Sequence, residues 1–225
     1  MNSTPVVQPA RERIFKRLHA SGTKHTQVPD PPLPQEPVLE RDEKIERLTA
    51  LMTAVRTEIH MVEAAAWIEK LEELARERGW KRLLYGPKSP IGPEIESAWP
   101  ADAKGLPERV PYVREVETFK KDLFETVDVA VTSTRGAVAD TGAVVLWPTP
   151  EEPRLMSLVP PVHVAVLDAD TIYTSMTAMM TAENWVAGMP TNALLISGPS
   201  KTADIEFTLV FGVHGPKELI IIIRK

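Results

Sequence analysis

The sequence predicts an α/β fold with a mostly parallel central sheet, flanking helices and an inserted β-meander. Three observations predict it. A strand, a helix and a second strand follow one another over residues 58–85, which is the βαβ unit of a parallel sheet. Residues 162–167 and 219–223 are almost continuously apolar, as expected of strands that are covered on both faces. Residues 129–147 alternate short β-branched runs with turn residues, which indicates hairpins.

The first 40 residues are expected to lie outside the main domain, which should span residues 41–225. Ile14, Phe15 and Leu18 fall at helical spacing among basic residues, which predicts a short amphipathic helix over residues 9–20. Prolines crowd residues 27–38, and such a composition marks a linker. Two interpretations of the helix stay open, namely packing on its own domain and docking onto a partner subunit.

The main domain begins with two predicted helices, residues 41–57 and 64–78, each with apolar residues at helical spacing. Gly79 is suited to end the second helix, and strands are expected at residues 58–62 and 82–85. Residues 89–109 are rich in proline and are predicted to be a loop. The next predicted segments are a helix at 119–126, a strand at 127–131, and turns at Arg135-Gly136 and at Asp140 to Gly142.

The last third of the main domain contains one site-bearing loop. After the strand at 162–167, a helix is predicted over 172–181, with methionines that fill the core. A strand at 192–196 then leads into the polar loop that starts at Ser197, and a helix is predicted over 203–210. Such a strand-to-helix turn presents free backbone N–H groups at a sheet edge, where α/β proteins usually bind ligands. A central strand at 219–223 closes the chain.

Composition excludes several classes of function. The net charge is -5 and no block of Lys and Arg occurs, which argues against nucleic-acid binding. No apolar run is long enough to cross a membrane and the N-terminus has no secretory pattern, so a cytoplasmic location is expected. Cysteine is absent, so the chain forms no disulfide and offers no thiolate for catalysis or for an iron–sulfur cluster. The histidine spacings match no metal motif, so we expect no metal site.

The candidate ligand-binding residues fall in four segments: Ser197, Gly198, Ser200, Lys201, Thr202 and Asp204; Asp140, Thr141 and Gly142; Glu151 and Arg154; and His214. Lys201 and the helix N–H groups after it would suit a carboxylate or a phosphate, although a capped structural turn is an equal interpretation. The loop is not a Walker A motif, because Ser200 stands where that motif needs glycine.

The other three segments have structural interpretations as well. Asp140 suits a turn that hydrogen-bonds its own backbone, residues 147–154 suit a solvated loop stiffened by proline, and a lone histidine such as His214 is usually structural. The functional hypothesis is that Asp140, Lys201 and His214 gather in one cleft along a rim of the sheet.

Residues 136–147, 150–158, 160–163, 197–206 and 212–216 agree in order and spacing with one family. Together they resemble the lactate utilization protein C family, which carries a LUD domain. The resemblance implies a fold similar to sugar-phosphate isomerases, CoA transferases and formyltetrahydrofolate cyclo-ligase, called NagB/RpiA/CoA transferase-like. It also implies a role in oxidising L-lactate to pyruvate with two partner proteins, at least one of which carries iron–sulfur clusters.

Two functions therefore stay open. In the first, the chain is a subunit of an L-lactate utilization system, holds no redox cofactor itself, and relies on the iron–sulfur clusters of its partners. In the second, it is a stand-alone enzyme or sensor for an anionic small molecule such as a nucleotide, an acyl-CoA or a hydroxy acid. The sequence decides neither whether the chain is catalytic nor its oligomeric state.

Overall fold

The computed structural model describes residues 10–20, 37–99, 103–113, 116–203, 209–212 and 214–225. The chain divides into two units, residues 1–35 and 36–225. In the first unit, helix α1 (Ala10–Ala20) forms where the sequence predicts an amphipathic helix, and all of its residues are exposed.

The second unit is built on a six-stranded sheet in which every neighbouring pair of strands is parallel. The prediction of a mostly parallel sheet is therefore confirmed. The strand order is β1-β12-β7-β4-β2-β3. The strands are β1 (Glu58–Val62), β2 (Arg82–Tyr85), β3 (Glu108–Pro111), β4 (Val129–Ser133), β7 (Val162–Asp168) and β12 (Glu218–Arg224). The four isoleucines of β12 are fully buried, because both faces of this strand are covered.

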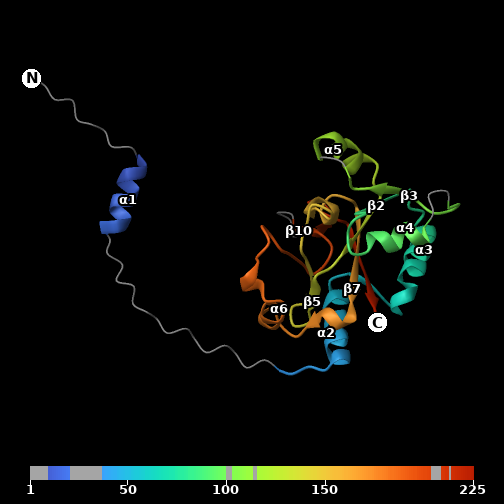
Figure 1. Ribbon diagram of the computed structural model, residues 1–225, viewed down its shortest axis with the longest axis horizontal. Coiled ribbons are helices and arrows are strands. Elements are labelled where there is room, and N and C mark those ends of the chain that lie inside the picture. The colour runs from blue at the N-terminus through green and yellow to red at the C-terminus, as the bar shows by residue number, and fades with distance from the viewer. Residues whose placement is uncertain (1–9, 21–36, 100–102, 114–115, 204–208, 213) are drawn as a thin grey trace, which may run out of the picture. The chain divides into compact units, whose positions relative to one another are not determined.

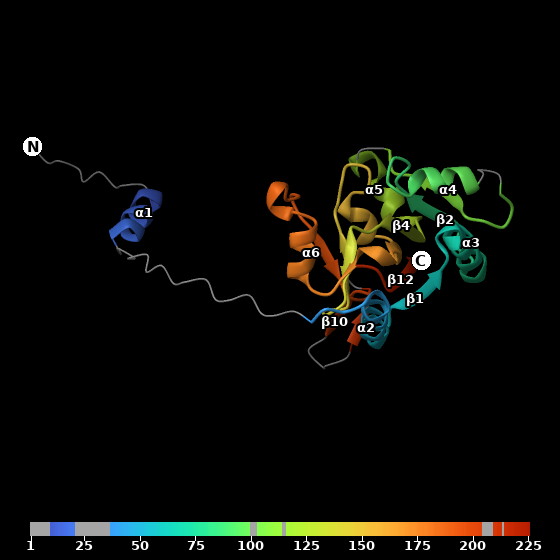
Figure 2. The ribbon, with the colours of Figure 1, turned by 60° about the horizontal axis from the view of Figure 1, so that its bottom comes forward.

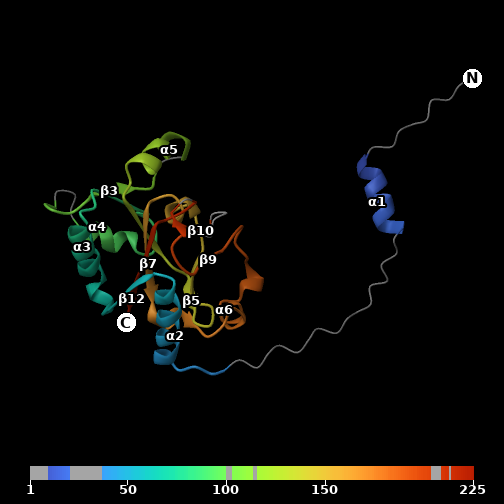
Figure 3. The same cartoon turned by 180° about the vertical axis from the view of Figure 1, so that it is seen from behind.

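Helices cover both faces of the parallel sheet (Figures 1 and 3). On one face, α3 (Trp67–Arg78) and α4 (Gly92–Ala98) bury a cluster that includes Trp67, Val131 and Ile222. On the other face, α2 (Arg41–Ala54) buries Leu48 in a cluster that includes Ile221. On this second face, α5 (Val116–Glu125) packs Phe119 and Leu123 against strands β2 and β4. Successive side chains of a strand point to opposite faces of the sheet, so β2, β4, β7 and β12 each contribute to the clusters on both faces.

A second sheet of four strands, in the order β8-β5-β6-β9, packs on the same face as α2 (Figure 2). Its strands are β5 (Gly136–Val138), β6 (Ala143–Leu146), β8 (Ile172–Tyr173) and β9 (Leu194–Ile196). Strands β5 and β6 form the predicted antiparallel hairpin, but β9 comes from far along the chain. Helix α6 (Met176–Ala182) and Trp185 cover the outer side of this sheet, where Met179 and Trp185 form a cluster with Val138 and Val145.

Two predicted segments differ from the structure in part. Residues 89–109 contain α4 and the start of β3. Pro93 is compatible with α4 because it lies in the first turn, where proline is tolerated. The helix predicted over 172–181 begins only at Met176, because the Ser175 hydroxyl accepts the N–H of Ala178 and caps it there. Residues 1–9 and 204–208 are outside the described part of the chain.

The helix predicted over residues 203–210 is wrong at the residues that the structure describes. Strands β10 (Lys201–Ala203) and β11 (Leu209–Phe211) form an antiparallel hairpin instead. Threonine, valine and phenylalanine in these two strands favour extended backbone over helix. At Ala203, where the predicted helix would begin, the backbone is therefore extended, and the anion-binding helix start is not found at that residue.

The turn of the β5–β6 hairpin fits closely against α2. Gly142 has a φ of 60°, in the left-handed region, and a Cβ built there would lie 2.6 Å from the Cβ of Leu51. Its neighbour Asp140 forms an ion pair with Arg47 of α2, with 2.9 Å between Oδ1 and Nη2. Gly142, a candidate ligand residue by sequence, thus allows the two elements to touch.

We predict that Gly142→Ala destabilises the protein more than Gly79→Ala. Both glycines have left-handed backbone, which costs an L-residue roughly 1–2 kcal/mol. Only Gly142 faces a fixed neighbour, since nothing lies within 4 Å of a Cβ built at Gly79, and overpacking adds about 1–3 kcal/mol. Urea unfolding of the two variants measures the difference, and equal losses of unfolding free energy would contradict the close packing of the hairpin on α2.

Candidate functional site

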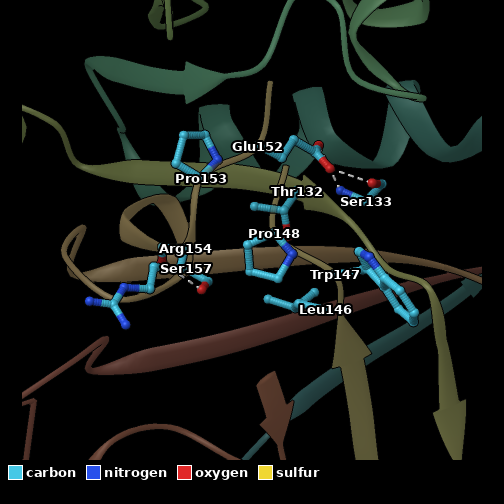
Figure 4. A pocket seen from close by; sticks show the side chains of 9 residues that line it. All are labelled: Thr132, Ser133, Leu146, Trp147, Pro148, Glu152, Pro153, Arg154 and Ser157. Carbon is cyan, nitrogen blue, oxygen red and sulfur yellow. Dashed lines mark hydrogen bonds between the residues drawn. The ribbon is translucent and has the colours of Figure 1, made fainter. Parts of the chain in front are cut away.

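A mostly buried carboxyl group lies at the carboxyl end of β4. Glu152 Oε1 accepts the backbone N–H of Ser133, the last residue of β4, at 2.9 Å, and Oε2 accepts the hydroxyl of the same serine (Figure 4). Burial raises the pKa of Glu152 above its usual value, and the hydrogen bonds from Ser133 and from the Ser89 hydroxyl oppose this shift only in part. The group can therefore take up a proton more readily than an exposed glutamate.

The loop that carries Glu152 is rigid for reasons that its sequence shows. Pro148, Pro150 and Pro153 each fix one φ angle in residues 147–154. The hydroxyl of Thr149 accepts the N–H groups of Glu151 at 3.2 Å and of Glu152 at 3.1 Å. The N–H of Thr149 donates to the carbonyl of Glu152 at 3.2 Å and closes the turn. These contacts fix the backbone position from which the Glu152 side chain reaches β4.

The loop after β2 packs directly on the loop that carries Glu152. A Cβ built at Gly86 would lie 2.3 Å from the carbonyl oxygen of Glu151, so only glycine allows this approach. The approach brings the buried Ser89 next to Glu152, and the Ser89 hydroxyl also accepts the N–H of Gly92 at 3.0 Å. The loop after β2, the end of β4 and the loop after β6 therefore meet at the Glu152 carboxyl.

A cavity of about 170 Å³ opens beside this carboxyl group. Its lining consists of Pro90, Ser133, Thr134, Arg135, Trp147, Thr149 and Glu152. We call it the carboxyl-edge cavity. A narrow gap between the two sheets adjoins this cavity and shares Trp147 and Glu152 with it. Thr132 and Ser157 also line the gap (Figure 4). Ser157 also lines a larger cavity of about 250 Å³, so three hollows follow one another along the interface of the two sheets.

Arg135 supplies a positive charge to the carboxyl-edge cavity and is held from two sides. Its guanidinium forms an ion pair with Glu183 and lies over the ring of Trp147, 5.3 Å from the centroid. Glu183 also accepts the hydroxyl of Tyr173 at 2.6 Å. Burial and this hydrogen bond raise the pKa of Tyr173 to about 12, so its hydroxyl remains a donor to Glu183. The ion pair and the stacking fix the direction of the guanidinium.

The larger cavity lies beside the amino-terminal ends of β7 and β12, and we call it the amino-edge cavity. Four candidate residues line it, namely Ser197, Gly198, Ser200 and His214. Backbone hydrogen bonds join the two loops that carry them, since the Ser200 N–H donates to Pro216 and the Ser200 carbonyl accepts from Gly212, each at 2.9 Å. The structure thus brings together the loop that starts at Ser197 and the turn around His214, and their role in ligand binding stays a prediction.

The predicted cleft of Asp140, Lys201 and His214 does not form, because only His214 lines the amino-edge cavity. Asp140 is paired with Arg47, and Thr141 is exposed in the same turn. Lys201 begins β10 with an exposed side chain. The predicted position at the ligand-binding edge of the parallel sheet is also wrong. The strand before Ser197, β9, belongs to the small sheet, and the amino-edge cavity lies opposite to the carboxyl ends of the parallel strands.

Four further sequence candidates remain, namely Glu151, Arg154, Thr202 and Asp204. The backbone of Thr202 is part of β10, and Asp204 is outside the described residues. Arg154 lines the narrow gap, but its exposed side chain points away from Glu152 and Trp147 (Figure 4). Glu151 contributes its backbone to the contact with Gly86.

The sequence candidates do not include four polar residues at or beside the carboxyl-edge cavity, namely Ser89, Ser133, Arg135 and Glu152. The sequence does contain one signal for Glu152. The prolines of residues 147–154 predict a rigid loop, and Glu152 lies in that loop beside the candidates Glu151 and Arg154. The meeting of the four residues depends on the adjacency of β2 and β4, which the order of strands along the chain does not give.

A fully buried histidine, His163, lies at the wall of the amino-edge cavity. His163 Nε2 is 2.9 Å from the hydroxyl of Thr132, and Nδ1 has no hydrogen-bond partner among the residues that the structure describes. Burial lowers the pKa of His163 to about 4, so the imidazole is neutral at pH 7. Within the described ranges, no group of three or more His, Asp or Glu side chains could hold a metal ion, and no helix is long and apolar enough to cross a membrane.

We predict that the protein loses stability as the pH falls from about 6.5 to about 4. In this window the unfolded chain binds a proton at His163 and the folded chain does not, which favours unfolding by up to roughly 3 kcal/mol. His163→Gln should remove this part of the pH dependence, whereas His19→Gln, on the exposed helix α1, should keep it. Urea unfolding between pH 4 and pH 7 measures the slopes, and equal slopes for wild type and His163→Gln would refute the assignment.

Comparison with known proteins places this fold in a family. Residues 45–223 match the family model of the LUD domain. An uncharacterized protein of Neisseria meningitidis serogroup B is 39% identical over 181 residues, which cover 80% of this chain and 76% of that protein. Lactate utilization protein C of Bacillus subtilis is 31% identical over 172 residues, which cover 75% of this chain and 66% of that protein.

A third relative matches over a shorter stretch. Lactate utilization protein C of Shouchella clausii is 36% identical over 95 residues, which cover 41% of this chain and 42% of the relative, so the match spans less than half of either protein. The crystal structure of a DUF162 family protein from Deinococcus radiodurans has the same fold, with a TM-score of 0.58 at 20% identity over 84% of this chain and 100% of that chain. The chain described here belongs to the LUD domain family.

Proposed function

We propose that the chain is a subunit of an L-lactate utilization system, in which L-lactate is oxidised to pyruvate together with iron–sulfur partner proteins. The observation that carries this proposal is the 31% identity, over three quarters of the chain, to lactate utilization protein C of Bacillus subtilis. That match covers 66% of the relative, so the activity of the whole relative is carried over here as an inference.

The composition supports a division of labour between this chain and its partners. Oxidation of a hydroxy acid to an oxo acid removes two electrons, and these need an acceptor. The sequence contains no cysteine, and iron–sulfur clusters are held by cysteine thiolates. We therefore assign the clusters to the partner proteins and assign to this chain the binding of a small molecule or of the partners themselves.

A second candidate function is a stand-alone enzyme or sensor for an anionic small molecule. The observation that favours it is the amino-edge cavity, where Ser197, Ser200 and His214 converge beside a space of about 250 Å³. That volume is below the range of roughly 300–1,000 Å³ that is typical of drug-sized ligands, which favours a small acid over a nucleotide. The two functions differ in whether partner proteins are needed for activity.

We predict that deletion of the gene abolishes growth on L-lactate as the sole carbon source and leaves growth on glucose unchanged. Extracts of the deletion strain should reduce a dye with L-lactate only at the background rate, because the system lacks one subunit. Adding the purified chain should restore the rate, and adding heat-denatured chain is the control. A deletion strain that reduces the dye at the wild-type rate with L-lactate would rule out the proposed role and leave the stand-alone function.

A further inference from the structure

We propose that the carboxyl-edge cavity binds a small 2-hydroxy or 2-oxo monocarboxylate, with Arg135 holding the carboxylate and Glu152 holding the neighbouring oxygen. The inference deepens the proposed function and rests on it for the choice of L-lactate and pyruvate as probes. Its physical basis is the set of described residues that line the cavity.

Arg135 has the chemistry and the fixed position that a carboxylate anchor needs. A guanidinium is planar and has five N–H donors, which match the two oxygens of a carboxylate. The ion pair with Glu183 is made through Nη2, so further donors are available to a ligand. The ring of Trp147 lies under the guanidinium and limits its movement, which lowers the entropy cost of binding.

Glu152 provides the second point of recognition. Its two oxygens are already positioned by Ser133, and the Thr149 turn fixes its backbone. When protonated, the carboxyl group donates its O–H to an oxo group, and its oxygens still accept a hydrogen bond from a hydroxyl. One side chain can thus bind both the reduced and the oxidised form of a 2-oxygenated acid.

The size and the walls of the cavity select a short acid. Its volume of about 170 Å³ is well below the range of roughly 300–1,000 Å³ of drug-sized sites, so a nucleotide or an acyl-CoA does not fit inside. Pro90 and Trp147 supply apolar surface for a methyl or methylene group. Ser133, Thr134 and Thr149 supply the remaining polar surface.

The charges around the cavity couple ligand binding to a proton. Arg135 and Glu183 neutralise each other, so an ionised Glu152 leaves one net negative charge beside the site. A carboxylate ligand would double that charge unless Glu152 becomes protonated. The other polar and charged groups on the packed elements are Ser133 of β4, Ser89 and the exposed Lys88 of the loop after β2, and Glu151 and the outward-pointing Arg154 of the Glu152 loop.

We therefore expect binding to take up one proton, at Glu152. The affinity should then rise as the pH falls from 8 towards 5.5, by up to tenfold per pH unit. Burial has already raised the pKa of Glu152, which makes this proton uptake easier. The neutral variant Glu152→Gln should bind with an affinity that does not depend on pH.

Isothermal titration calorimetry of the full chain tests the site with sodium L-lactate, pyruvate and propionate. L-Lactate and pyruvate should bind, and propionate, which lacks the 2-oxygen, should bind at least tenfold more weakly. Arg135→Gln should weaken L-lactate binding at least tenfold. Arg41→Gln is the matched control, because Arg41 is as exposed as Arg135 and is also paired with one carboxylate, that of Asp170. This control should bind as the wild type does.

The proposal is overturned if Arg135→Gln and wild type bind L-lactate equally, if propionate binds as well as L-lactate, or if neither oxygenated acid binds at pH 5.5. Arg135→Lys, which keeps the charge but not the fork, should also weaken binding and replaces Arg135→Gln if that variant fails to fold. A growth defect on L-lactate without binding to the purified chain would refute this site and leave the proposed function intact. Binding without a growth defect would refute the function and leave the site.

Discussion

The hydrogen bonds between Glu152 and the end of β4 are the interaction on which the arrangement of the site depends. A carboxyl group taken out of water is unfavourable unless donors replace the solvent. Here the last N–H of β4 and two serine hydroxyls do so, and the carboxyl in turn satisfies a strand end. The contact fixes the loop after β6 against the end of β4, and the lining of the carboxyl-edge cavity follows from that position.

Residues 134–136, which follow β4, join the parallel sheet to the small sheet through backbone hydrogen bonds. The N–H and the hydroxyl of Thr134 both donate to the carbonyl of Val166 in β7, at 3.1 and 3.0 Å. The N–H of Arg135 then donates to Val145 of β6 at 2.8 Å, and β5 starts at Gly136. A Cβ at Gly136 would lie 2.5 Å from the carbonyl oxygen of Thr171, so glycine permits the close approach of β5 and β8. The direction of the Arg135 side chain therefore follows from backbone pairing on both sides of it.

Much of the fold was predictable because single segments determine it. The apolar runs of β7 and β12 and the βαβ pattern of residues 58–85 require a covered parallel sheet whatever the rest of the chain does. The prediction fails at the β10–β11 hairpin because a polar loop after a short strand is also typical of a parallel α/β unit, although the residues of the hairpin favour strand. Residues such as Ser89 and Glu152 are far apart in sequence, and only the pairing of β2 with β4 brings them together. Local patterns contain no information on that pairing.

His163 and Glu152, at the interface of the two sheets, change the folding stability in opposite directions as the pH falls. Their effects can therefore be told apart. His163 has a pKa lowered to about 4, so its neutral form favours the folded state near pH 7 and this advantage is lost as the pH falls. Glu152 has a raised pKa, so its contribution to folding stability is fully present below the ordinary pKa of 4.5 and is lost as the pH rises through the raised value. In the pH interval above about 4 the folded protein keeps the imidazole neutral, whereas the carboxyl of Glu152 is able to gain a proton. A proton taken up with a ligand in that interval consequently belongs to the carboxyl end of the interface, and the histidine contributes only a neutral hydrogen bond to Thr132.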